Sequence, residues 1–205
     1  MKLSFTWRNI FLIETASLWH DMALNEVTDR ASHGEQAGEL FLQTFPDDKY
    51  FNEDEKETIC FILKYHDKAN LVRNSESDLR LLHMLNIVTD ADTIELLGER
   101  GFERAVEVVK ANGWPVFNPS NPRGDTFGFS SSQFDERFLL KSKGQIDYVK
   151  EPTLVGQLNF QISCADNLKT KKGGEIGMPR AEYLRNKLDE LINQKAKILL
   201  ESPKK

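Results

Sequence analysis

Apolar residues recur every three or four positions along most of this chain, and almost no segment alternates between apolar and polar residues as a strand would. The 205 residues, 40% of them hydrophobic, are enough for one globular domain with a sizeable core. We therefore expect an all-α fold, a single helical bundle of about six or seven helices that spans residues 1–205. The expected helices cover residues 5–23, 29–44, 77–97, 102–110, 155–168 and 179–200, with a further helix that begins near residue 52.

Individual residues indicate where several of these helices begin and end. Asn52 is suited to cap a helix whose first turn is acidic. The segment 77–97 is apolar on nearly every side, which predicts a buried central helix. Gly98 and Gly101 bracket the end of that helix, and Pro179 suits the first position of the last one.

Residues 112–150 differ from the rest of the chain, because prolines, glycines and aromatic residues interrupt the helical pattern there. A stretch of this length without regular structure is usually functional or mobile. We expect either a lid over a substrate or a flap that packs its phenylalanines on the core. The aromatic side chains of this aromatic-rich loop include Trp114, Phe117, Phe127, Phe129, Phe134 and Phe138.

Charge and cysteine content narrow the classes of partner and compartment. With 27 basic and 32 acidic residues, the net charge of -5 gives no electrostatic footprint for long nucleic acid. No apolar run is long enough to span a membrane, and residues 1–19 are interrupted by charges, as in a helix and not a signal peptide. Cys60 and Cys164 have no CxxC partner, so we expect reduced core residues of a cytoplasmic protein.

Histidine is scarce in this sequence, and three of the four histidines lie on the apolar sides of expected helices, at His20, His33 and His66. A lone histidine in such a position is more often a packed core residue than a ligand. Asp92, however, also lies on the apolar stripe of its helix, and a buried carboxylate is costly unless it is paired or binds a metal. Together these residues predict a metal site.

Two His-Asp dyads are candidates for the centre of this site. Only 25 residues separate Asp67 from Asp92, enough for one loop and part of one helix, whereas 71 residues separate Asp21 from Asp92. The longer separation leaves room for the helices that must pack to bring two aspartates together. We therefore choose His20-Asp21, with His66 close by and Asp67 as a solvated or capping neighbour.

Asp90 and Asp92 cannot both face one site, because residues two apart on a helix point about 200° from each other. His83 shares the helix face of Asp90 and lies opposite Asp92. We expect His83 and Asp90 to form a structural pair or to support the site from outside.

Motifs in five parts of the chain resemble one known family. In Ile87–Ala105 an Asp-Ala-Asp motif leads into a short glycine-initiated helix, and Ser17–Met22 carries a His-Asp dyad in a turn. His33 and His66 match two later histidines, and the tail Leu168–Leu188 has the pattern of a closing helix. These segments resemble small stand-alone bacterial members of the HD-domain metal-dependent phosphohydrolase superfamily.

The resemblance implies roles for five residues. His20, Asp21 and Asp92 would bind a divalent ion, and Asp21 or Asp92 would help to deprotonate water. His33 and His66 would bind a second metal or stabilise phosphoryl oxygens. Imidazoles and carboxylates without a thiolate favour Mn²⁺, Fe, Co²⁺, Ni²⁺ or Mg²⁺, and such a set also accommodates Zn²⁺.

The resemblance also implies the class of substrate, a small phosphorylated molecule and in particular a nucleotide. Arg104 and Arg180 match arginines of the family. They either bind this substrate in the pocket or form ion pairs on helix surfaces.

Three departures from the family pattern bear on activity. The family's first His, a helix before the dyad, has no counterpart among the 19 residues before His20. Thr93 stands where many relatives have Lys or Arg, and Glu95 replaces an Asp. We expect weak metal retention and low turnover. The alternative is a degenerate, catalytically inactive HD-fold protein that acts as a binding or regulatory module.

Overall fold

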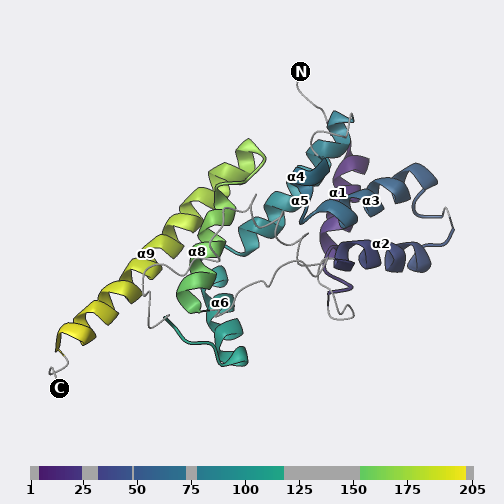
Figure 1. The fold of residues 1–205 in the computed structure, drawn as a ribbon. Helices are drawn as coiled ribbons and strands as arrows, with labels where there is room; N and C mark the ends of the chain where they lie inside the picture. Colours follow the sequence, from purple (N-terminus) through teal and green to yellow (C-terminus); the bar gives the residue numbers. More distant parts are fainter. Residues whose placement is uncertain (1–4, 25–31, 48, 73–77, 118–152, 202–205) are drawn as a thin grey trace. The chain divides into compact units, whose positions relative to one another are not determined.

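A computed structural model describes residues 5–24, 32–47, 49–72, 78–117 and 153–201 of the chain. The described residues are helical and contain no strand, so the all-α prediction is confirmed (Figure 1). Most of the predicted aromatic-rich loop, from residue 118 to 150, lies outside the described residues. The helices are α1 (Trp7–Trp19), α2 (His33–Thr44), α3 (Glu53–Tyr65), α4 (Ala69–Val72), α5 (Leu79–Glu95), α6 (Gly98–Asn112), α8 (Leu154–Ala165) and α9 (Lys171–Glu201).

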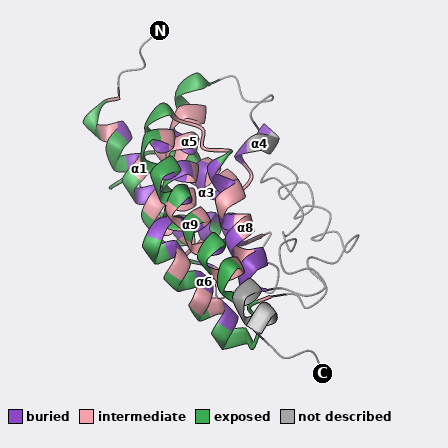
Figure 2. Cartoon of the chain, turned by 90° about the vertical axis from the view of Figure 1, so that its left-hand side faces the viewer, coloured by how far each residue is buried: buried purple, intermediate pink, exposed green. Residues whose placement is uncertain are grey.

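The chain divides into two compact units, and the boundary falls within α5, between Asp92 and Thr93. The first unit contains α1 to α4 and most of α5, and the second contains α6, α8 and α9. In both units the helices carry buried residues on one side and exposed residues on the other (Figure 2). The expectation of one domain stays a prediction.

Capping side chains begin three helices of the first unit, namely α1, α3 and α5. The Asn52 side chain accepts a hydrogen bond from the Glu55 backbone amide, and the Glu55 carboxylate accepts one from the Asn52 backbone amide, which confirms the predicted N-cap. Thr6 caps α1 in the same reciprocal way with Asn9. Asp78, whose carboxylate accepts from two following amides, occupies the corresponding position before α5.

The first unit is held together by α3, which packs against both α1 and α2. Arg8 on α1 forms a two-pronged ion pair with Glu55 on α3, at 2.6 and 2.7 Å. A Cβ atom at Gly34 of α2 would overlap the Leu63 carbonyl of α3, so a glycine is needed where these helices meet. The core of this unit includes Leu12, Ala16, Phe41, Phe51, Ile59, Ile62, Leu63, Met84, Leu85 and Val88.

In the second unit, α6 begins earlier than its predicted start at residue 102. Gly98, which was expected to end the preceding helix, is the first residue of α6 and has a φ of 76°, a conformation that favours glycine. A Cβ at Gly101 would overlap the Leu96 carbonyl. The two glycines therefore allow α6 to begin directly after Leu97, where the sequence suggested a longer break.

The last helix differs most from its prediction, because α9 begins at Lys171 and Pro179 lies inside it. The Thr170 hydroxyl accepts a hydrogen bond of 2.8 Å from the Gly173 amide, so Thr170 acts as the cap. The prediction that Pro179 occupies the first helical position is wrong, since this cap lies earlier in the sequence. The α9 helix packs against α6 and α8, and none of the described helices is both long and apolar enough to cross a membrane.

Candidate metal centre

Both His-Asp dyads lie directly after the last residue of a helix, and each histidine is fixed in the same way. The Nδ1 atom of His20 lies 2.8 Å from the Ser17 carbonyl at the end of α1. The Nδ1 atom of His66 lies 2.7 Å from the Leu63 carbonyl at the end of α3. A carbonyl oxygen only accepts hydrogen bonds, so both Nδ1 atoms carry hydrogen and each neutral ring keeps its lone pair on Nε2.

The predicted site residues of the first unit come together around these Nε2 atoms. His20 Nε2 lies 3.6 Å from Asp21 Oδ2 and 3.6 Å from Asp92 Oδ1. His33 Nε2 lies 3.4 Å from Asp21 Oδ1 and 3.1 Å from His66 Nε2. Four segments distant in the sequence therefore meet at one point, as the choice of the His20-Asp21 dyad requires.

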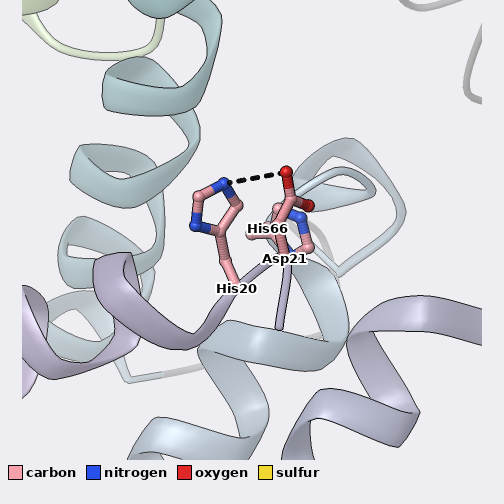
Figure 3. Close-up of side chains that lie close together, drawn as sticks. All are labelled: His20, Asp21 and His66. Carbon is pink, nitrogen blue, oxygen red and sulfur yellow. Dashed lines mark ion pairs between the residues drawn. The ribbon is translucent and has the colours of Figure 1, made fainter. Parts of the chain in front are cut away.

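His66 takes a more central place than the sequence suggested. One ligand atom each from His20, Asp21 and His66 lies within 4.8 Å of the other two (Figure 3). These three residues could hold a metal ion. The rings of His20 and His66 meet edge to face with centroids 5.1 Å apart. His66 is thus placed to contact the same metal ion as His20 and Asp21.

The approach of α2 to α3 explains how His33 joins the cluster. His33 is the first residue of α2, and the following Gly34 lies against the Leu63 carbonyl that also fixes the His66 ring. His33 and His66 are 6% and 1% exposed, whereas the Asp21 and Asp92 side chains are 39% and 30% exposed. The imidazoles therefore form the buried side of the site and the carboxylates form its open side.

The charges of the cluster shift the pKa values of its members in opposite directions. Burial opposes the charged form of His20, but the close approach of Asp92 and the charges of Asp21 and Asp92 prevail and raise its pKa to about 9. The interaction with His33 lowers the pKa of Asp21 to about 2, against the effect of burial. Burial lowers the pKa of His66, which favours the neutral form that can bind metal.

Two neighbours of the cluster were missed or misjudged from the sequence. The Thr89 hydroxyl donates a hydrogen bond of 2.8 Å to the His66 backbone carbonyl. No pattern of periodicity marks such a contact. Asp67 was expected to be solvated or to cap a helix, but its Oδ1 atom is buried and has no hydrogen-bond partner among the residues that the structure describes.

The other face of α5 carries His83 and Asp90, the two residues that we expected to pair. His83 stacks on Phe5 with the ring centroids 5.3 Å apart and the planes 11° from parallel. Asp90 is 3% exposed, so it is more deeply buried than Asp92. The pairing of His83 with Asp90 stays a prediction.

Arg104 and Arg180, the predicted substrate-binding residues, belong to the second unit. Both line a cavity of about 850 Å³ together with Arg100 and several glutamates. The Arg180 guanidinium also donates to the Ile94 carbonyl over 3.4 Å. Their proposed role in substrate binding stays a prediction.

Comparisons with known proteins bear on the fold alone. Neither a family model nor a curated protein sequence matches the chain. The fold is similar to that of a Lactobacillus plantarum protein whose crystal structure was solved as a Northeast Structural Genomics target. The TM-score is 0.61 over 90% of this chain and 76% of that chain, with 16% sequence identity. The similarity therefore supports the helical architecture of this chain.

Proposed function

We propose that this chain is an HD-type, metal-dependent phosphohydrolase. One observation carries the proposal, namely the convergence of three imidazoles and two carboxylates from distant segments, with the rings of His20 and His66 each oriented by a backbone carbonyl at Nδ1. Carbonyl partners of this kind orient histidine ligands in metal sites. The order of these residues in the sequence supports the same family.

The donor set fits a divalent ion, which His20, Asp21, Asp92 and His66 would hold. Nitrogen and carboxylate donors without thiolates suit Mn²⁺, Fe, Co²⁺ or Ni²⁺, and Mg²⁺ and Zn²⁺ are the further candidates. When bound, such an ion lowers the pKa of water and offsets charge on phosphoryl oxygens. The His66 imidazole would supply a second nitrogen ligand beside His20.

The protein's own groups would then handle the proton and the phosphoryl group. Asp21 and Asp92 form the open side of the site, where their carboxylates can accept the proton that water loses. His33 lies beside Asp21 and would orient that carboxylate and stabilise a phosphoryl oxygen.

The substrate in this proposal is a small phosphorylated molecule, in particular a nucleotide. The net charge of -5 disfavours long nucleic acid as a partner. A cytoplasmic location belongs to the proposal as well, because Cys60 and Cys164 are both free thiols.

The test combines metal analysis with a substrate screen. Purified protein is assayed on nucleoside mono-, di- and triphosphates with Mn²⁺, Co²⁺ and Ni²⁺. We expect hydrolysis of one class, loss of nearly all activity in Asp92→Ala, and near-normal activity in His83→Ala, since His83 stacks on Phe5. Stoichiometric metal without hydrolysis would favour the inactive binding or regulatory module. Activity that survives Asp92→Ala would contradict the proposed site.

A further inference from the structure

The His66 carbonyl has an unusual hydrogen-bond donor. His66 follows the last residue of α3, where backbone carbonyls lose their partners within the helix. The residue is 1% exposed, so water cannot readily replace such a partner. The Thr89 hydroxyl of α5 donates to this carbonyl over 2.8 Å.

Three other helical threonines use their hydroxyls differently. Thr15, Thr44 and Thr58 each donate to the carbonyl four residues earlier in the same helix, at 2.8 to 2.9 Å. This is the common behaviour of a threonine within a helix. Thr89 instead donates to a residue 23 positions away.

The position of Thr89 connects this bond to the metal ligands. Thr89 precedes Asp92 by three residues on α5, and residues at this spacing share one face of a helix. The Thr89 hydroxyl therefore ties the backbone of His66 to the helix face that presents Asp92. The His66 ring is fixed independently by the Leu63 carbonyl.

We propose that Thr89 is a positioning residue that holds His66 in register with Asp92 for metal binding. The inference rests on the proposed metal site and extends it to a residue that touches neither metal nor substrate. Partners that orient ligands from behind typically change metal affinity by about 10- to 100-fold when they are removed. Without its donor, the His66 carbonyl must move to find another partner, and the imidazole moves with it.

The experiment titrates the purified full-length chain with Co²⁺ alone, by calorimetry and by the visible absorption of the bound ion. Thr89→Val keeps the branched shape, Thr89→Ala removes the hydroxyl and favours the helix, and Thr89→Ser restores the hydroxyl. We expect Val and Ala to weaken Co²⁺ binding by about 10- to 100-fold and Ser to bind like the wild type. Thr58→Val is the matched control, because its hydroxyl bonds only within α3.

Circular dichroism first establishes that each variant is folded at the temperature of the titration. Should Thr89→Val not fold, the comparison of Ala with Ser decides the question. Wild-type affinity and absorption in the Val or Ala variant would overturn the positioning role. So would a Ser variant as weak as Ala. If the wild type binds no Co²⁺, the proposed function itself fails, and the inference fails with it.

Discussion

At the scale of single residues, the proposed role of His20 as a ligand would make metal binding depend on pH. Asp92 and Asp21 raise the pKa of His20 from 6.5 to about 9, so in the metal-free protein at neutral pH the ring carries a second proton and a positive charge. Because this pKa is raised, protonated His20 stabilises the folded state at low pH. The stability that protonated His20 contributes is fully present below pH 6.5 and is lost as the pH rises through about 9.

A metal ion must displace that proton, and this gives a measurable pH dependence. We expect the apparent Co²⁺ affinity to increase between about pH 7 and about pH 9, with about one proton released per ion. Calorimetry in two buffers of different ionisation enthalpy measures the released protons. Affinity that does not change over this range would mean that His20 is not a ligand.

The residues of the cluster were largely predictable, because their order in the sequence and their positions on apolar stripes are local signals. The importance of His66 was underestimated. Both dyads follow the end of a helix and have the same backbone bond, which no spacing argument between aspartates can reveal. Thr89 was beyond prediction, since its partner is brought near only by the packing of α5.

At the scale of elements, the contact between α2 and α3 sets the position of His33. A Cβ at Gly34 would overlap the Leu63 carbonyl, whereas a Cβ at Gly38, one turn later, would lie 3.7 Å from Cys60 in ordinary contact. The same substitution at these two positions should therefore have opposite effects. Gly34→Ala would push α2 away from the carbonyl that orients His66.

We expect Gly34→Ala to lower the free energy of unfolding by about 1–3 kcal/mol, as overpacking does, and to weaken Co²⁺ binding. Gly38→Ala should be neutral or stabilise by up to about 1 kcal/mol, since alanine favours a helix. Urea unfolding followed by circular dichroism measures both variants. Equal effects at the two positions would show that the close contact at Gly34 is unimportant.

Helix positions were predictable where caps and periodicity agreed, as at Asn52 before α3. They were not where glycine or proline lies within a helix. Gly98 begins α6 at a positive φ, and Pro179 lies inside α9 because Thr170 provides an earlier cap. Glycine usually ends a helix and proline usually begins one. Here the backbone geometry at Gly98 and the hydrogen bond at Thr170 determine the helix starts instead.

At the scale of the whole molecule, all five residues of the proposed metal centre belong to the first unit, and each unit has its own hydrophobic core. An ion that binds only the folded state at 100 times its dissociation constant stabilises that state by about 2.7 kcal/mol. We therefore expect Co²⁺ to slow amide hydrogen exchange most in α1, α3 and α5, which carry or directly precede the proposed ligands.

Exchange in α8 and α9, whose core is separate, should change much less. Mass spectrometry of peptides from both units, with and without Co²⁺, makes the comparison within one sample, and His20→Ala provides the control for nonspecific binding of the ion. Protection concentrated in α8 and α9 would contradict a metal centre built from the first unit. Global unfolding sets the exchange rate of the slowest amides in every helix. The change in exchange rate caused by Co²⁺ is therefore compared between the units for amides that exchange through local opening.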